Sequence, residues 1–330
     1  MADSPMNICM VGYGMMGTWH TDALGDCDVV LHTLVGRRAD AAKAFAEKRG
    51  YRKWTTDYPE ALADDEIDLV ILANPSQIHA ETALASIAHG KPTLVEIPIA
   101  MNLADAERVV AAARQRKVTL GMVHPMRMRP EMIALRQRTR ADSERITQIT
   151  AQFCIHRLEN VGGTGYRRSW TDNLLWHHIT HSLDFGLWLL NAPPVRKVHS
   201  FMTPVDPRTG IPMEVFLAVE AATDQALICT GSYSSHDKAF GVRVITDRNA
   251  YRLDVYEGTL TTKDGTQSSD AEARICGRVT EDFVAAVRDG REPAITGESV
   301  LPAMRVLQAA QDQWDQRHGP QSVPGRPLAE

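Results

Sequence analysis

Residues 8–17 read ICMVGYGMMG, an apolar run followed by three glycines in the spacing G-x-G-x-x-G. The run predicts a short buried strand, and the residues after the last glycine, TWHTDAL, have a helical pattern. In a strand–turn–helix setting such glycines permit a tight turn and let a pyrophosphate approach the helix N-terminus. The alternative is a glycine-rich turn without a ligand. We predict a dinucleotide phosphate site formed by Gly12, Tyr13, Gly14, Met15, Met16 and Gly17.

Short apolar runs alternate with amphipathic ones from Asn7 to about Val123. LVILA (69–73), for example, is followed by HAETALASIAHG and then by PTLVE, and residues 103–116 have a helical pattern. Strand and helix in repeated alternation are typical of a doubly wound parallel sheet. We therefore predict an α/β fold with an N-terminal Rossmann domain over residues 1–123.

The pattern changes after His124 to longer alternating segments, such as ITQITAQFCIHR (146–157) and ALICTGSYSS (226–235). Apolar and polar residues in alternation predict an open, mostly antiparallel sheet with one wet face. Helices are predicted at 281–289 and 299–316. The prediction is a C-terminal α/β domain over 124–316, which binds substrate and mediates oligomerisation, and a flexible tail over 317–330.

Length and composition limit the classes of function. A chain of 330 residues exceeds the roughly 250–300 residues of a single core, and its net charge of −5 gives no general attraction to nucleic acid or anionic membranes. The five cysteines are scattered and form no C-x-x-C pair, which indicates reduced thiols. The N-terminus lacks a basic leader, and no apolar run reaches the roughly 18 residues of a membrane span. We expect a cytoplasmic protein without nucleic-acid or membrane partners.

The end of the second predicted strand bears on the choice of cofactor. An NAD site ordinarily has an acidic residue there, about 20 residues after the glycines, which accepts from the ribose hydroxyls. Residues 35–38 instead read VGRR. Two guanidinium groups suit a 2′-phosphate, so we predict NADP rather than NAD, with Arg37 and Arg38 as the discriminating residues. The alternative is a solvated basic turn.

Four segments resemble the glucose–fructose oxidoreductase / inositol dehydrogenase (Gfo/Idh/MocA) family in order and spacing. They are GYGMMGTWH (12–20), ANPSQIHAETALASIAHGKPTLVEIPIA (73–100), MRMRP (126–130) and HHITHSLDF (177–185). The resemblance implies a nicotinamide-binding Rossmann domain and an α/β domain whose open sheet shapes the substrate pocket and often the oligomer interface. It also implies a cofactor site lined by Asn74, Pro75, Ser76 and His79, with Glu96 and Ile97 at the nicotinamide end.

The chain departs from the family pattern at two places. The usual Glu-Lys-Pro is Glu-Ile-Pro at 96–98, so the lysine that assists proton transfer is missing, and His177 stands where the family carries an aspartate. His181 matches the catalytic histidine of the family, and Asp184 matches the acid after it. The departures argue against a neutral polyol or glucose. The resemblance, taken with these departures, implies a substrate that reacts as a cyclic hemiacetal and is oxidised to a lactone, with His181 as the general base and His177 as a hydrogen-bonding or relay group.

The resemblance also implies a small dicarboxylate substrate, and arginines bind such anions through pairs of hydrogen bonds. Arg127 falls on a family position that faces the pocket. We predict further substrate contacts from Arg129, Tyr166, Arg168, Trp170, His178 and Asp184, with Arg157, Arg167, His124, His156 and His236 as possible polar neighbours. Each of these arginines is also compatible with a solvated surface charge.

Other interpretations stay open at this point. His177 and His181 have the i, i+4 spacing of a zinc pair, but no third ligand is evident, and we predict no metal. The histidines can also be satisfied core residues. The alternative functions are an NADP-dependent sugar, sugar-acid or polyol dehydrogenase and a non-catalytic NADP-binding sensor. An open sheet with one exposed face predicts a homodimer.

Overall fold

The computed structural model describes residues 4–161, 170 and 173–319. The chain forms two compact units. The first contains the chain up to Val123 together with Cys276–Leu301, and the second contains most of residues 124–275 and continues from Pro302. The predicted second domain over 124–316 is therefore wrong in one respect, because residues 276–301 belong to the first unit.

Residues 276–301 pack against β6 (Leu120–Met122), the last strand of the first unit. Phe283 in α8 (Glu272–Asp289) lies so near the backbone that a Cβ on Gly121 would come within 2.4 Å of its ring. Met122 N donates to Ile295 O at 2.9 Å, and Gly297 N donates to Leu120 O at 3.0 Å. These hydrogen bonds join residues that are far apart in the chain, so no local pattern in the sequence predicts them.

Six strands form the sheet of the first unit in the order β3-β2-β1-β4-β5-β6. Every neighbouring pair is parallel. Strand β4 is buried along its whole length, as expected where helices cover both faces of a sheet. The predicted Rossmann fold is confirmed, with β1 (Met6–Val11), β2 (Val29–Val35), β3 (Lys53–Thr55), β4 (Leu69–Leu72), β5 (Thr93–Val95) and β6.

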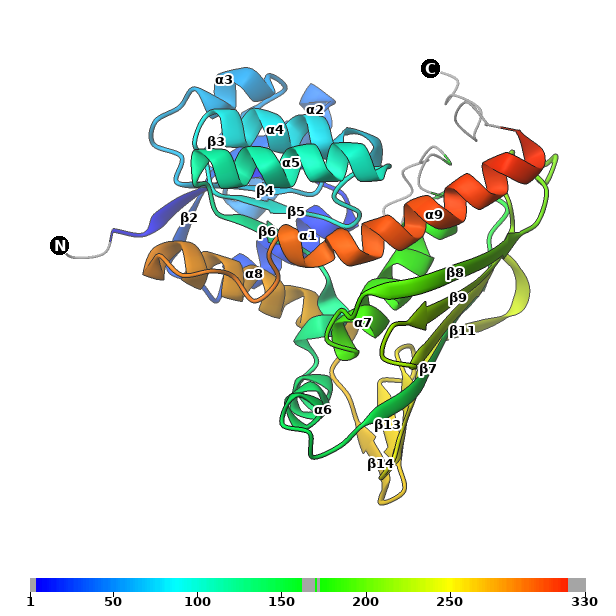
Figure 1. Ribbon diagram of the computed structural model, residues 1–330. Helices are drawn as coiled ribbons and strands as arrows, with labels where there is room; N and C mark the ends of the chain where they lie inside the picture. The colour runs from blue at the N-terminus through cyan, green and yellow to red at the C-terminus, as the bar shows by residue number, and fades with distance from the viewer. Residues whose placement is uncertain (1–3, 162–169, 171–172, 320–330) are drawn as a thin grey trace. The chain divides into compact units, whose positions relative to one another are not determined.

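Local signals define the helices of this unit. The Asn102 side chain accepts from Asp105 N at 2.8 Å and caps α5, whose bounds are those predicted. Gly50 ends α2 with φ +81°, a conformation that suits glycine. Helices α4 and α5 lie side by side in Figure 1. The bounds are α1 (Met15–Leu24), α2 (Ala39–Arg49), α3 (Tyr58–Leu62), α4 (His79–Ala88) and α5 (Leu103–Arg116).

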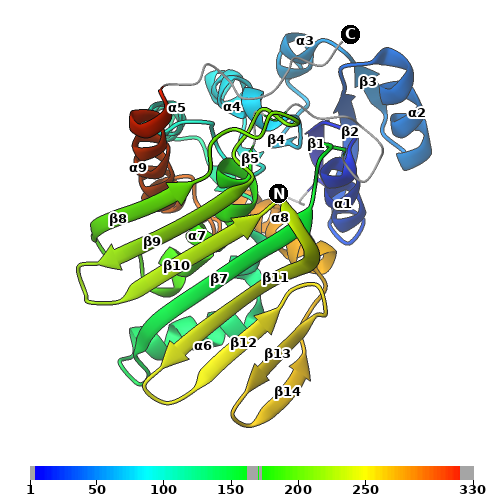
Figure 2. The same cartoon turned by 90° about the vertical axis from the view of Figure 1, so that its right-hand side faces the viewer.

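Eight strands form the sheet of the second unit, in the order β14-β13-β12-β11-β7-β10-β9-β8 (Figure 2). Only β7 and β10 pair in parallel, and the other neighbours are antiparallel. The predicted open, mostly antiparallel sheet is confirmed. Its strands are β7 (Ile146–His156), β8 (Val195–Met202), β9 (Glu214–Ala221), β10 (Ala226–Ser232), β11 (Ser234–Thr246), β12 (Ala250–Asp254), β13 (Thr259–Thr262) and β14 (Gly265–Ser268).

The two faces of this sheet differ. Helix α7 (Thr180–Leu189) packs on β7 and β10, so closely that a Cβ on Gly186 would lie 2.5 Å from the Leu227 side chain. Side chains that point the other way include Phe201 and Phe216, which are about half exposed with ring centroids 6.0 Å apart. One face therefore holds the core, and the other leaves aromatic surface uncovered.

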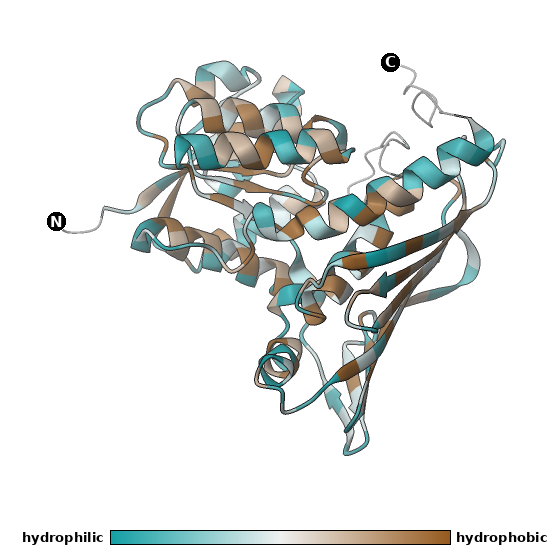
Figure 3. Ribbon diagram, viewed as in Figure 1, coloured by the Kyte–Doolittle hydropathy of each residue, from teal (hydrophilic) through white to brown (hydrophobic). Residues whose placement is uncertain are grey.

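Helix α9 (Leu301–His318) is amphipathic, and its residues alternate between hydrophilic and hydrophobic in Figure 3. Ser200 N in β8 donates to Gln313 Oε1 at 2.9 Å and ties the helix to the sheet edge. The helix continues two residues past the predicted end at 316, so the tail predicted to begin at 317 begins no earlier than Gly319. In the part of the chain that the structure describes, no helix has the length and apolarity to cross a membrane.

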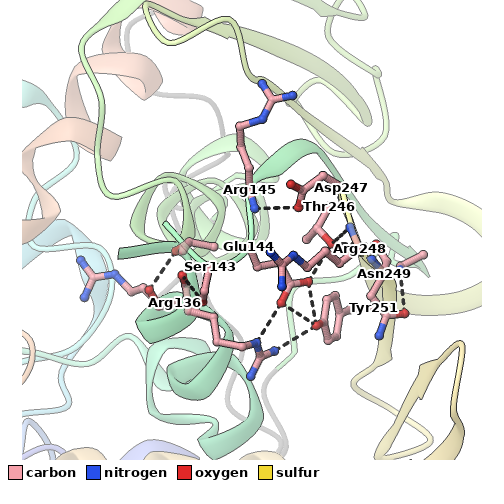
Figure 4. Close-up of polar contacts among 12 residues, drawn as sticks. Arg136, Ser143, Glu144, Arg145, Thr246, Asp247, Arg248, Asn249 and Tyr251 are labelled. Carbon is pink, nitrogen blue, oxygen red and sulfur yellow. Dashed lines mark hydrogen bonds and ion pairs between the residues drawn. The ribbon is translucent and has the colours of Figure 1, made fainter. Parts of the chain in front are cut away.

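A buried carboxylate joins α6 (Pro130–Arg140) to the sheet (Figure 4). Glu144 is 5% exposed and accepts from Arg138 Nε at 2.8 Å, from Thr246 Oγ1 at 2.7 Å and from Tyr251 OH at 2.9 Å. Burial would raise the pKa of Glu144, but the hydrogen bonds from Arg138, Thr246 and Tyr251 outweigh it and hold this pKa below its usual value.

Glu144→Gln is expected to lower the free energy of unfolding of the second unit by about 1–3 kcal/mol, because charge-assisted hydrogen bonds are lost. Since folding lowers the pKa of Glu144, the ionised carboxylate stabilises the fold at pH values above its usual pKa of 4.5, and this stabilisation is lost as the pH falls below that value. Urea denaturation at pH 7 and at acid pH tests this. Glu220→Gln, which alters the exposed Arg196–Glu220 pair, is the control and should change stability little. Equal losses in the two variants would contradict the prediction.

Candidate active site

The glycine turn has the geometry of a phosphate cradle. Gly12 has φ +115°, and a Cβ on it would lie 2.3 Å from Ala73 O. A Cβ on Gly17 would lie 2.3 Å from Gly12 O, whereas one on Gly14 would meet nothing within 4 Å. The backbone is therefore closely packed at Gly12 and Gly17, and space remains at Gly14, just before α1 begins at Met15. A pyrophosphate fits this arrangement, with the backbone N–H groups of the turn and of Met15 and Met16 as donors.

The other predicted cofactor residues lie on the same edge of the sheet. Gly12 N donates to Val35 O at 2.9 Å, Ala73 N to Val11 O at 2.8 Å, and Glu96 N to Leu72 O at 3.0 Å. These bonds align the carboxyl ends of β2, β1, β4 and β5. Ligands of doubly wound sheets bind outside this edge.

Tyr13 and the two arginines form the β2 end of this edge. The Tyr13 ring packs on Gly36, where a Cβ would come within 2.3 Å of it. The Tyr13 hydroxyl accepts from Arg38 N at 3.4 Å, just before α2 begins. Arg37 and Arg38 are exposed, so their guanidinium groups can reach a ligand over β2.

His79 organises the loops after β4 and β5. It is 1% exposed, and its Nδ1 and Nε2 lie 2.6 Å from Pro98 O and 2.9 Å from Asn74 O. Asn74 Nδ2 in turn donates to Thr82 Oγ1 at 3.1 Å. The polar atoms of His79 thus face protein carbonyls, and the residue shapes the loop that carries Pro75 and Ser76.

Glu96 and Ile97 follow β5 and are buried, with 6% and 8% of their surfaces exposed. Glu96 Oε1 lies 2.9 Å from His20 Nε2, and Oε2 accepts from Ile97 N at 3.1 Å. The sequence interpretation overlooked His20. The available signal was a histidine on the inner face of the helix that follows the glycine turn.

The histidine segment does not begin as an α-helix. Residues Leu175–Ile179 form a π-helical turn, with Ile179 N donating to Leu174 O at 3.0 Å, and α7 begins only at Thr180. Such turns widen the helix and change which side chains share a face. The rings of His177 and His181 lie 6.3 Å apart.

His178 is fixed from three sides. Its ring is stacked on Phe153 at 3.7 Å and on His177 at 4.0 Å, and its Nδ1 lies 2.7 Å from the Tyr233 hydroxyl. Tyr233 is fully buried and was also overlooked in the sequence, where it lies in the strand-like segment 226–235. The stack holds the plane of His177 beside His181.

Asp184, one turn after His181, forms a buried ion-pair cluster. Its carboxylate accepts from Arg127 Nε at 2.7 Å and through its other oxygen from Arg127 Nη2, and His124 Nδ1 lies 2.7 Å away. All three residues are less than 5% exposed. Burial would raise the pKa of Asp184, but Arg127 and His124 lower it to about 2. The Arg127 guanidinium therefore binds Asp184, whereas the sequence analysis predicted that Arg127 contacts the substrate.

The remaining predicted substrate residues are dispersed. Arg129 is 1% exposed and donates to Ser269 Oγ and Asp270 O. Trp170 lies 5.9 Å from the Tyr233 ring, and the Arg157 guanidinium lies over both rings. His156 and His236 stack on each other, with ring centroids 4.4 Å apart. Tyr166, Arg167 and Arg168 lie outside the described residues.

Two groups of possible metal ligands occur among the residues with described positions: His20, Glu96 and Cys276, and His32, Asp64 and Glu66. Neither includes the histidine segment.

Comparison with known proteins decides the family. Residues 6–124 match the oxidoreductase family with an NAD-binding Rossmann fold, named for Gfo, Idh and MocA, and residues 130–268 match the C-terminal domain of bacterial oxidoreductases. A curated relative, the 4-carboxy-2-hydroxymuconate-6-semialdehyde dehydrogenase of Sphingobium sp. (strain NBRC 103272 / SYK-6), is 34% identical over 92% of this chain and 96% of its own. The chain belongs to the Gfo/Idh/MocA family. It is an NAD(P)-dependent oxidoreductase.

Two further proteins are similar to this chain, one over a shorter part of the sequence and one in fold. Inositol 2-dehydrogenase 2 of Saccharopolyspora erythraea is 33% identical over 56% of this chain and 54% of its own. A solved structure of levoglucosan dehydrogenase in complex with NADH and levoglucosan superposes with a TM-score of 0.82 over 94% of this chain and 98% of the other, at 16% identity. This likeness shows the shared fold.

Proposed function

We propose that the protein is an NADP-dependent dehydrogenase that converts the cyclic hemiacetal of 4-carboxy-2-hydroxymuconate-6-semialdehyde to 2-pyrone-4,6-dicarboxylate, a step of protocatechuate 4,5-cleavage in the breakdown of lignin-derived aromatics. The observation that carries the proposal is the 34% identity to the Sphingobium enzyme over almost the whole length of both chains. The replacement of the family lysine by Ile97 supports it, because a hemiacetal hydroxyl is more acidic than a simple alcohol and needs less assistance.

The proposed chemistry needs one base. The C–H bond of the carbon that carries the hydroxyl breaks, and its electron pair leaves with the hydride to the nicotinamide. The hydroxyl proton goes to His181, and the C–O bond becomes the lactone carbonyl. Histidine suits this role because its ordinary pKa, about 6.5, lies near working pH. His177, 6.3 Å away, accepts or relays the proton.

The substrate carboxylates need cations other than Arg127, whose guanidinium is engaged by Asp184. We place one carboxylate near Arg157, the arginine that lies beside Trp170 and Tyr233. Arg168 and Tyr166, outside the described residues, are the further candidates. We also propose that the protein is a homodimer. A second copy of the chain covers the exposed aromatic face that includes Phe201 and Phe216.

The decisive experiment is NADP reduction, followed by absorbance, with the 4,5-cleavage product of protocatechuate and with inositol and glucose as controls. Reduction with the semialdehyde alone is the expected result. Reduction with inositol or glucose would instead support the second candidate, a polyol or sugar dehydrogenase, which the inositol dehydrogenase relative favours.

The preference for NADP rests on the exposed pair Arg37 and Arg38 at the end of β2. Arg37→Asp is expected to weaken NADP binding by about 10- to 100-fold and NAD binding much less, because a carboxylate replaces a partner of the 2′-phosphate. Dissociation constants for both cofactors test this. Arg52→Asp, at the opposite edge of the sheet before β3, is the matched charge reversal and should leave both constants unchanged. An unaltered NADP-to-NAD ratio in Arg37→Asp would disprove the assignment.

A further inference from the structure

A buried cluster in the first unit ties Glu96 to two helices. His20 in α1 is fully buried, with Nε2 2.9 Å from Glu96 Oε1 and Nδ1 2.7 Å from Thr280 Oγ1 in α8. Ile97 N donates to the second oxygen of Glu96. The two oxygens of the Glu96 carboxylate are therefore hydrogen-bonded by different segments of the chain.

The hydrogen bonds of this cluster converge on the Glu96 carboxylate. An ionised carboxylate only accepts, so His20 Nε2 donates to Oε1 and Ile97 N donates to Oε2. A buried charge kept in this way is costly, and such groups concentrate at functional sites.

Glu96 lies at the ligand-binding edge of the sheet. It follows β5, and its N–H bonds to Leu72 O at the end of β4. β5 is two strands from β1, or about 10 Å at the usual spacing, on the side away from β2. A dinucleotide with its pyrophosphate at the glycine turn and its adenosine ribose over β2 has its nicotinamide end toward Glu96.

We propose that His20 is a positioning residue that holds the Glu96 carboxylate where its charge favours the oxidised nicotinamide over the reduced one. The oxidised ring is positively charged and the reduced ring is neutral, so a fixed negative charge stabilises only the oxidised form. A dehydrogenase gains from this, because it must bind the oxidised form and release the reduced one. The inference rests on nicotinamide binding and does not depend on which substrate is oxidised.

A metal site is the competing explanation of the cluster. Cys276 brings its sulfur within 4.8 Å of the facing atoms of His20 and Glu96. However, both ring nitrogens of His20 already have partners, and a metal ion would have to break the His20–Glu96 bond. The hydrogen-bonded network accounts for the geometry without an ion.

The test measures dissociation constants of NADP⁺ and NADPH for the full-length protein and its variants. Glu96→Gln removes the charge, His20→Asn removes the tether, and Thr280→Val removes the hydroxyl that orients His20. We expect the ratio of the NADP⁺ to the NADPH constant to rise about tenfold in Glu96→Gln, about threefold or more in His20→Asn, and in the same direction in Thr280→Val. Ser86→Ala, which removes another buried hydroxyl of this unit, should leave the ratio unchanged.

Equal weakening of both cofactor forms in His20→Asn would mean a purely structural role and would overturn the proposal. An unchanged ratio in Glu96→Gln would overturn it too, as would stoichiometric zinc that is lost in Cys276→Ser. If His20→Asn does not fold, Thr280→Val decides, because it retains the histidine. Failure of the wild-type protein to bind either form would remove the cofactor assignment itself, whereas activity with a polyol alone would remove only the proposed substrate.

Discussion

His181→Asn is expected to lower kcat for oxidation of the semialdehyde by about 10²–10⁴-fold, the usual contribution of a general base. Asparagine keeps a polar group of similar reach but cannot take up the hydroxyl proton. The dissociation constant of NADP⁺ should stay near its wild-type value, because the substitution leaves the residues of the glycine turn unchanged. Steady-state kinetics and cofactor titration together test this expectation.

His89→Asn is the control for this variant, because His89 is exposed at the end of α4 and its Nδ1 bonds to Ala85 O of the same helix. It should have wild-type kinetics. Near-normal turnover in His181→Asn would show that another group is the base. A loss of kcat in which NADP⁺ affinity falls equally would indicate a disturbed fold rather than lost proton transfer.

The sequence sufficed for the fold wherever the signal was local. The glycine spacing after Ile8–Val11 and the repeated strand–helix pattern predict the parallel sheet, and period-two alternation predicts β7 and β10. It failed for the segment 276–301, whose place depends on Phe283 packing at Gly121 and on the bonds of Ile295 and Gly297 to β6. Such long-range pairing leaves no periodicity in the residues that make it.

The candidate site shows the same limit. The spacing of the histidines predicts that they lie close together, but a π-helical turn and an α-helix have the same apolar pattern, so the 6.3 Å separation of His177 and His181 was not predictable. Chemistry identifies the types of residue, such as Arg127 and Asp184, that can bind anions or orient a base. Only the packing of η2 (Pro125–Met128) on α7 shows that these two residues bind each other.

Asp184→Asn is expected to lower the free energy of unfolding of the second unit by about 3–5 kcal/mol, because the change leaves the Arg127 charge buried without its counter-ion. Arg127 is 4% exposed and Asp184 1% exposed, so water cannot replace the lost partner. Folding lowers the pKa of Asp184 from 3.8 to about 2, against the effect of burial and through Arg127 and His124. Its ionised form therefore stabilises the fold at pH values above 3.8, and this contribution is lost as the pH falls toward 2.

Thermal and urea unfolding of wild type and variant between pH 8 and pH 3 test this expectation. The difference in the free energy of unfolding between the two proteins should be constant down to about pH 4 and smaller below that pH. Asp206→Asn is a matched control, because Arg208 holds the pKa of Asp206 at about 2 by comparable hydrogen bonds, while the Arg208 side chain is 59% exposed. Asp206→Asn should lower the free energy of unfolding much less, since water can solvate the Arg208 guanidinium that remains. If Asp184→Asn and Asp206→Asn lower the free energy of unfolding by similar amounts, burial of Arg127 does not determine how much the ion pair contributes to stability. The fold would then not depend on the buried Asp184 cluster.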